Sequence, residues 1–340
     1  MTFPPTSDYD YKYTTYSSTF TPDQLSIALN LGHAGLNIVG AVPNLLNVTV
    51  LILLVRRYGC TKNAYGLFLA AGLFELGMNI LWSIYQLTVY VRKGSPLPIS
   101  SDPLLYDSNF QYLLINLTPH FLSFLSTASE FVILAMAVIS LIGIGLKQFK
   151  SWISLSAVIA VIIGALVVSV ALSLPGWLLT KLIAWKDRHE ISSPDFYGSY
   201  VFEYLRAYGI ITVYMPYGLT LLLIILLTWA TREYSLEEEY HTVVVILTAV
   251  LAWKLICETP LILIQALIRW AYLPTANLFT WLEIARYSLV LEYSLKGLIY
   301  FSFNSLYRQT ALGKAQSVPA AATAAPTAAP QDQGMYSFYT

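Results

Sequence analysis

The amino-acid sequence predicts an all-α membrane protein, built as a seven-transmembrane helix bundle with a short amphipathic eighth helix. Of the 340 residues, 56% are hydrophobic and only 11% are charged, whereas soluble domains carry about 25% charged residues. Seven apolar runs are long enough to cross about 30 Å of hydrocarbon as helices. The apolar composition leads us to expect membrane lipid around the bundle. The net charge is zero, so we expect no nucleic-acid partner.

The seven apolar runs follow one another along most of the chain. They cover Ala28–Val55, Tyr65–Val91, Leu113–Gly145, Trp152–Leu174, Ala207–Ala230, Thr242–Ile268 and Leu278–Phe303. The next stretch, NSLYRQTALGK (304–314), is short and amphipathic, which suits a helix lying on the membrane surface. The halves of the chain share no internal repeat, which argues against a transporter made of duplicated bundles.

Polar segments flank the bundle on both sides. Residues 1–27 are polar and rich in tyrosine, and we expect them to form an extracellular tail. They lack the basic and apolar regions of a cleavable signal peptide, so the first span is expected to act as the insertion signal. Residues 315–340 consist largely of Ala, Pro, Thr and Gln and are predicted to be a disordered cytoplasmic tail. The bundle and its amphipathic helix therefore take up residues 28–314.

Soluble-enzyme chemistry has little support in the sequence. The two cysteines, Cys60 and Cys257, are too few for a disulfide framework or a thiolate metal site. The motifs HExxH, CxxC, GxxxxGK[ST] and GxSxG do not occur. We therefore expect a protein that is not an enzyme and that binds no cofactor.

Charge does not decide the orientation of the bundle. Lys and Arg residues are divided evenly between its two predicted sides, so the positive-inside rule gives no answer. The basic turn RRYGCTK (56–62) mildly favours its own side as cytoplasmic. The expectation of a cell-membrane protein with an extracellular N-terminus therefore rests on the motifs within the spans, which are described next.

Short motifs occur within the spans in a fixed order. They are GAVPNLLNV, AGLFELGM, VYMPYG, CETP and KGLIYFSFN, which contain in turn Asn44, Glu75, Pro216, Pro260, and Lys296 with Tyr300. This order, across nearly the whole of residues 28–314, resembles the rhodopsin-like (class A) G-protein-coupled receptors. The corresponding patterns in that family are GxxGNxxV, LAxxDL, a proline in span five, CWxP and NPxxY. The resemblance implies a receptor that is an orphan or binds a peptide or chemokine.

The same alignment shows where the chain departs from that family. Ile139, Ser140 and Leu141 stand where the family has Asp-Arg-Tyr, and Glu258 replaces its toggle tryptophan. The cysteine pair that joins span three to the second extracellular loop in the family is missing. Such divergence is typical of virus-encoded or invertebrate receptor copies. By analogy this suggests a viral, chemokine-receptor-like protein acting in a host–virus interaction.

Three positions match the corners of the family's sodium pocket, namely Glu75, Ser129 and Lys296. In those receptors a mobile Na⁺ lies against the acid of span two and favours the inactive state. The resemblance implies that the Lys296 ammonium takes this position, so we expect a Glu75–Lys296 pair and no bound metal. Glu292, one helical turn before Lys296, is the competing partner.

A second set of charges matches the family's Pro-Ile-Phe packing switch. Glu130 and Lys254 occupy two of its corners and Pro216 the third, while Lys254 and Glu258 are four residues apart on span six. The resemblance implies a conformational switch made from Asn44, Glu75, Glu130, Ser140, Pro216, Lys254, Glu258, Pro260, Glu292, Lys296 and Tyr300. The alternative is that salt bridges replaced apolar packing and left an inert bundle.

Ser140 argues against efficient conventional G-protein activation. In the family, the arginine at this position contacts the C-terminal helix of the G protein, and serine cannot replace five guanidinium donors. The loop REYSLEEEYH (232–241) is also short and acidic. We therefore expect weak or atypical coupling to a heterotrimeric G protein.

The N-terminal stretch DYDYKYTTY (8–16) places tyrosines beside aspartates. Acid-flanked tyrosines suit sulfation, which would make a polyanionic strand for a basic peptide and resembles the tails of chemokine receptors. The candidate ligand-binding residues are Tyr9, Tyr11, Tyr13 and Tyr16. The alternative is an ordinary polar tail on a chain that acts without a ligand. A dimer with another receptor is a further expected partner.

Three other classes of membrane protein are alternatives to the receptor. A non-signalling decoy or scaffold that modulates other receptors is favoured by the missing arginine of span three. A retinal protein is disfavoured because an opsin-type lysine would fall near Val290 and not at Lys296. A transporter with a proton relay through Glu75, Glu130 and Lys254 is disfavoured because repeated, discontinuous helices are not found.

Overall fold

The computed structural model describes residues 24–60, 62–91, 109–146, 154–189, 210–234, 236–270 and 278–314. These ranges form α-helices with short helical turns and contain no strand, which confirms the predicted all-α class for this part of the chain. The helices are α1 (Gln24–Tyr58), α2 (Tyr65–Val91), α3 (Asn109–Leu146), α4 (Leu155–His189), α7 (Met215–Glu233), α8 (Glu238–Trp270), α9 (Leu278–Phe303) and α10 (Ser305–Ala311).

The helix bounds agree with the apolar runs at some ends and differ at others. α2 and α9 begin and end where the sequence predicts. α4 differs most, because it continues to His189 although its apolar run ends at Leu174. Backbone hydrogen bonds close a helix whether or not its side chains are apolar, so hydropathy marks the lipid-crossing part and not the helix end. A π-helical turn, Ile210–Tyr214, precedes α7.

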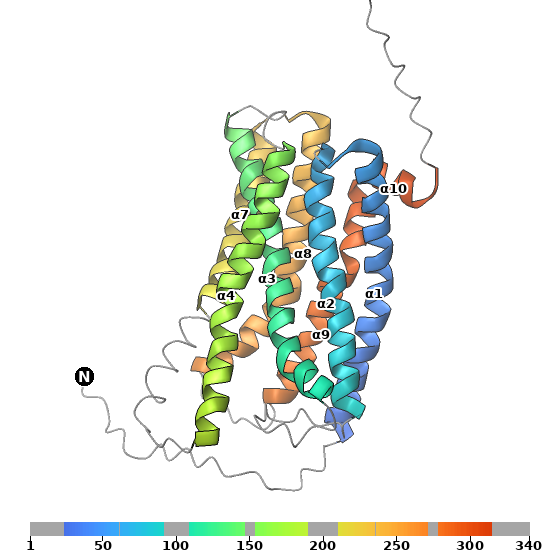
Figure 1. Cartoon of the computed structure of the whole chain (residues 1–340). Helices are drawn as coiled ribbons and strands as arrows, with labels where there is room; N and C mark the ends of the chain where they lie inside the picture. Colours follow the sequence, from blue (N-terminus) through green and yellow to red (C-terminus); the bar gives the residue numbers. More distant parts are fainter. Residues whose placement is uncertain are drawn as a thin grey trace, which may run out of the picture.

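Six of the described helices, α1, α2, α3, α4, α7 and α8, are long and apolar enough to cross a membrane. The described part is therefore a multi-pass, membrane-embedded bundle. α9 is not among these six, and its described side chains include Arg286, Glu292 and Lys296. α9 nevertheless runs within the bundle and packs closely against α1 and α8 (Figure 1). A seventh crossing by α9 and an amphipathic role for α10 stay predictions.

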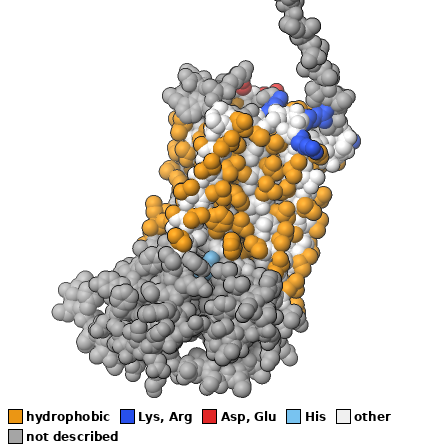
Figure 2. Space-filling view, in the orientation of Figure 1, with side chains coloured by type: hydrophobic (Ala, Val, Ile, Leu, Met, Phe, Trp, Pro, Cys, Tyr) orange, Lys and Arg blue, Asp and Glu red, His pale blue; other side chains and the backbone are white. Residues whose placement is uncertain are grey.

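The outer surface of the bundle is apolar, as expected of a protein whose solvent is lipid. On α4 the exposed residues Ile159, Ile163, Val167 and Val170 recur every three or four positions and form a lipid-facing stripe. Figure 2 shows hydrophobic side chains covering the flank of the bundle and blue Lys and Arg side chains gathered near one end. Polar side chains, ionisable ones among them, lie buried between the helices instead.

The arrangement of the helices places these buried side chains close together. α3 contacts α2, α4, α7 and α8, so it lies in the middle of the bundle (Figure 1). α1 and α9 approach closely at Gly40, where an added Cβ would lie 2.0 Å from Ser294 Oγ. The C-terminal end of α1, the start of α2 and α10 share one end of the bundle (Figure 1), which we call the α10 end.

Candidate functional site, a buried ionic core

The first cluster of buried charges joins α2, α3 and α9, and we call it the α2–α9 group. Lys296 Nζ lies 2.6 Å from Glu75 Oε1 and 3.2 Å from Glu292 Oε1. Ser129 Oγ donates a hydrogen bond of 2.8 Å to the same Glu75 oxygen. The side chains of Glu75, Glu292 and Lys296 are each only 2% exposed. The predicted Glu75–Lys296 pair is therefore present, and Glu292 is a second partner of Lys296 and not a substitute for Glu75.

The second cluster joins α3 to α8, and we call it the α3–α8 group. Lys254 Nζ lies 3.1 Å from Glu130 Oε1 on α3 and also forms an ion pair with Glu258, one turn further along α8. The Lys254 side chain is 5% exposed, whereas Glu130 and Glu258 are 13% and 19% exposed. The structure thus brings together the two charged corners that the sequence assigned to the packing switch.

The two groups together hold more carboxylates than ammonium ions. They contain four glutamates and two lysines, so full ionisation would leave a net charge of −2. An uncompensated charge in a dehydrated interior is costly. Loss of a lysine should therefore harm the bundle more than neutralisation of a glutamate. Among the described residues, no group of three or more His, Cys, Asp or Glu side chains is placed to hold a metal ion.

Asn44 lies on α1 and is fully buried. Both polar atoms of its side-chain amide, together with Glu292 Oε2, are without a hydrogen-bond partner among the described residues. Buried polar groups of this kind are uncommon, because native interiors satisfy most of them. No hydrogen bond in the described part joins the Asn44 side chain to the α2–α9 group, so its predicted switch role stays a prediction.

The two prolines of the predicted switch lie in different surroundings. Pro216 is buried in the first turn of α7, directly after the π-helical turn. Pro260 lies inside α8 and is exposed on the surface of the bundle. α7 is joined to α8 nearby by a hydrogen bond of 2.9 Å between the Tyr217 and Thr259 hydroxyls.

Ser140 lies near the α10 end of α3 and is buried. Its Oγ has no partner within the described part of the chain, but its backbone carbonyl accepts a hydrogen bond from the Tyr240 hydroxyl of α8. The first turn of α8 is thereby tied to α3. Sequence reasoning selected Ser140 because it stands where the receptor family has an arginine. It did not predict the role of Tyr240, because this side chain bonds to a backbone carbonyl, which every residue has.

Tyr300 lies near the same end and anchors α9 to its neighbours. Its ring packs edge-on against Phe68 of α2, with centroids 5.0 Å apart, and it lies tilted against the ring of Tyr307 of α10 at 5.7 Å. Tyr307 donates a hydrogen bond of 3.0 Å to Asn47 Oδ1 on α1. Burial raises the pKa of the Tyr307 hydroxyl, so it remains a donor at any physiological pH.

Asn304 joins α9 to α10. Its Oδ1 caps α10 by accepting from the Tyr307 backbone N–H at 3.0 Å, and its Nδ2 donates to the Tyr65 hydroxyl at 3.2 Å. α10 is therefore held against α1 and α2 by side-chain hydrogen bonds. Asn304 is the last residue of the KGLIYFSFN motif, and the cap gives it a structural role.

The candidate tail residues Tyr9, Tyr11, Tyr13 and Tyr16 lie outside the described residues. The described residues thus define a membrane bundle with two lysine-centred ionic groups in its interior. The chain matches no protein-family model, and a search of the curated proteins finds no match.

Proposed function

We propose that the chain is a diverged seven-transmembrane receptor of the class A type, in a cell membrane with its N-terminus outside, and that it couples to heterotrimeric G proteins weakly or atypically. The supporting observation is the pair of buried ion-pair groups, which join α2 to α9 and α3 to α8. In this proposal Lys296 is a tethered cation that takes the place of a mobile sodium ion beside Glu75.

Transmission of a signal through a helix bundle requires some helices to move relative to others. The Glu75–Lys296 and Glu130–Lys254 contacts each join two different helices, so separation of these helices would expose or strand a buried charge. Breaking a buried pair by removing one partner costs about 3–5 kcal/mol. A bundle held in this way favours one arrangement, which agrees with low signalling output.

A ligand for such a receptor would reach the end of the bundle opposite α10. A basic peptide or chemokine fits the acidic, tyrosine-rich tail, and the absence of any ligand would make the protein an orphan receptor. Dimerisation with another receptor would use the lipid-facing stripes.

The second candidate is a non-signalling decoy or scaffold that modulates other receptors. It is favoured by the state of Ser140, which is buried, offers no guanidinium to a G protein and lies where α8 is tied to α3 by Tyr240. In this alternative the ion pairs serve stability alone.

Recruitment of a G protein in cells separates the two candidates. We compare wild type, Ser140→Arg and Tyr240→Phe, with Gly145→Arg as a matched control that adds an arginine at an exposed position near the end of α3 with open space around it. The receptor proposal predicts low recruitment by wild type and higher recruitment by Ser140→Arg or Tyr240→Phe, but not by Gly145→Arg, at equal surface expression. No recruitment by any of these proteins would favour the decoy, and strong ligand-free recruitment by wild type would exclude it.

The orientation has its own test. An epitope at the N-terminus should be labelled on intact cells, and one after residue 314 only after permeabilisation. The reverse pattern would overturn the receptor proposal.

A further inference from the structure

A line of buried amide side chains runs along the contact between α1 and α2. Asn37, Asn44 and Asn47 recur on one face of α1, and Asn79 and Gln86 lie two helical turns apart on α2. All five residues are buried, and none is more than 4% exposed. We call this line the amide seam. Asn37, Asn79 and Gln86 lie outside the motifs shared with the receptor family, so the resemblance does not account for the seam.

The amides of the seam are poorly satisfied within the described part of the chain. Seven of their polar atoms have no hydrogen-bond partner there, namely both atoms of Asn44, both atoms of Asn79, Asn37 Oδ1, Asn47 Nδ2 and Gln86 Oε1. So many in one interface are unusual, because native interiors leave few buried polar groups without a partner. An isolated amide in a dry interior is costly, so the seam requires a further source of hydrogen bonds.

Three helices enclose the seam and separate it from lipid. The start of α1 lies at the end of the bundle opposite α10 (Figure 1), and there the His33 ring packs edge-on against Trp82 of α2 and Tyr287 of α9. The ring centroids are 5.3 and 5.2 Å apart. Further along, α1 and α9 approach closely at Gly40 and Ser294. The seam therefore lies in the interior of the bundle, among α1, α2 and α9.

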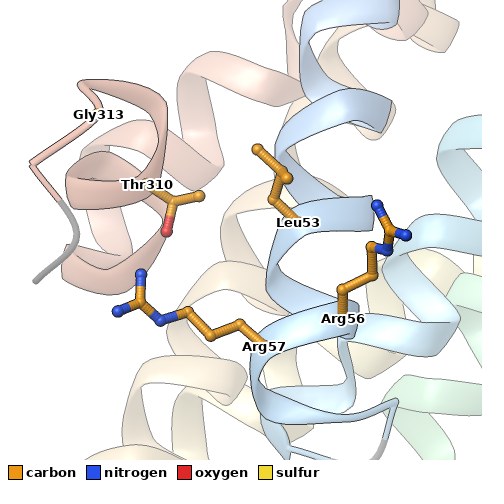
Figure 3. Close-up of a pocket in the computed structure, with 5 residues that line it drawn as sticks. All are labelled: Leu53, Arg56, Arg57, Thr310 and Gly313. Carbon is orange, nitrogen blue, oxygen red and sulfur yellow. The ribbon is translucent and has the colours of Figure 1, made fainter. Parts of the chain in front are cut away.

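The buried face of α1 becomes apolar toward the α10 end. Leu51 and Leu54 continue the face of Asn47 and are 1% and 0% exposed. A surface groove of about 510 Å³ between α1 and α10 is lined by other residues, namely Leu53, Arg56, Arg57, Thr310 and Gly313 (Figure 3). The seam therefore ends at Asn47 and is separate from this groove.

Water is the occupant that suits the unpartnered atoms of the seam. They comprise four amide oxygens, which accept, and three amide nitrogens, which donate. An anion would engage only the donors and a cation only the acceptors, whereas a water molecule serves both. A buried water typically makes about three hydrogen bonds to polar groups that are otherwise unsatisfied.

We propose that the amide seam binds a file of internal water molecules, held between α1 and α2 from the level of His33 to Asn47. Each water bridges amides that do not hydrogen-bond to one another in the described part of the chain. Leu51 stops the file before the α10 end. The waters join α1 to α2 by hydrogen bonds in addition to packing, and this role does not depend on the proposed receptor function.

Radiolytic labelling of the purified full-length protein in detergent tests the proposal. Hydroxyl radicals formed from bound water oxidise the side chains beside it, including those that bulk water does not reach. His33, which is 1% exposed and whose carbonyl accepts from the Asn37 amide, should be oxidised. Met136 is the control, because it is equally buried but belongs to the apolar core. Methionine reacts faster with the radical than histidine does, so protection of both residues would overturn the proposal.

The variant Asn79→Leu distinguishes bound water from bulk water that enters at the end of the bundle. Leucine is close to asparagine in size but cannot hold a water molecule. Oxidation of His33 should fall several-fold in this variant, while Met136 stays protected. Oxidation of His33 that is the same as in wild type would show entry of bulk water and would contradict the proposal.

The unfolding temperature gives a second readout with opposite signs for a wet and a dry seam. Loss of a water partner in Asn79→Leu should lower it by about 2–4 °C, the shift expected for about one hydrogen bond. In a dry seam the same change removes an unsatisfied amide and should raise it. Ser173→Ala is the control, since Ser173 Oγ also lacks a partner among the described residues but lies on α4. An equal loss in Ser173→Ala would count against the proposal. If Asn79→Leu does not fold, Gln86→Met takes its place in both assays.

Discussion

The α2–α9 and α3–α8 groups share one arrangement, a lysine between two glutamates, but they differ in how deeply they are buried. Lys296 and its partners are 2% exposed, whereas the partners of Lys254 are 13% and 19% exposed. The charge order also differs, since Glu292 precedes Lys296 along α9 whereas Lys254 precedes Glu258 along α8. Glutamate before lysine is the better order within a helix.

The difference in burial suits the two groups to different tasks. A fully dehydrated ion pair cannot open without stranding its charges, so the α2–α9 group is suited to hold the bundle together. Partial exposure lowers the cost of separating charges, so the α3–α8 group can rearrange more cheaply. We expect the α3–α8 group to be the more switch-like of the two.

The largest effect is expected from Lys296→Met. The substitution leaves Glu75 and Glu292 buried without their cation, so the free energy of unfolding should fall by about 3–5 kcal/mol. Thermal unfolding of the purified protein in detergent measures the loss. A smaller loss than that caused by Lys254→Met would contradict the claim that the α2–α9 group is the one that holds the bundle together.

Lys254→Met should destabilise less, by about 1–3 kcal/mol, because the carboxylates that lose their cation are less deeply buried. At equal surface expression it should also change basal G-protein recruitment more than Lys296→Met does. The same unfolding assay and the recruitment assay check both expectations. Equal recruitment by the two variants would contradict the expectation that the α3–α8 group is the more switch-like of the two.

Neutralising a glutamate tests the excess of carboxylates in the core. Glu292→Gln should have a small effect on the free energy of unfolding, whereas Glu75→Gln should cost more. The reason is that Glu75 accepts from both Ser129 and Lys296, while Glu292 leaves one oxygen without a hydrogen bond among the described residues. A larger loss for Glu292→Gln than for Glu75→Gln would contradict this ranking of the two carboxylates.

Ser129→Ala should have the smallest effect, about 1 kcal/mol, because it removes one hydrogen bond to a carboxylate that keeps its lysine. Ser169→Ala is the matched control, since Ser169 is buried on α4 and donates only to the Ala165 carbonyl of its own helix. Denaturation midpoints should place Ser129→Ala clearly below the control. Indistinguishable midpoints would show that the hydrogen bond to Glu75 contributes nothing.

Much of the fold and of the ionic core was predictable from the sequence. Apolar runs marked the helices because lipid requires long apolar segments. The charges could be paired because a glutamate or lysine in such a segment needs a partner, and the family resemblance gave the register that brought Glu75 to Lys296 and Glu130 to Lys254. That these residues act as a conformational switch stays a prediction.

The remaining features depend on information that residue patterns do not carry. The hydrogen bond from Tyr240 reaches a backbone carbonyl, which every residue has. The extension of α4 to His189 follows backbone hydrogen bonding through polar residues. The position of α10 against α1 is set by the Asn304 cap and the Tyr307–Asn47 hydrogen bond.

The most direct test of Lys296 as a tethered cation is the unfolding temperature of wild type and Lys296→Asn in NaCl and in KCl at equal ionic strength. A ligand that binds only the folded protein raises that temperature. Wild type should unfold at the same temperature in both salts, and Lys296→Asn should be more stable in NaCl, because Glu75 and Ser129 are then free to bind Na⁺. Sodium-specific stabilisation of wild type, or none in Lys296→Asn, would contradict the proposal.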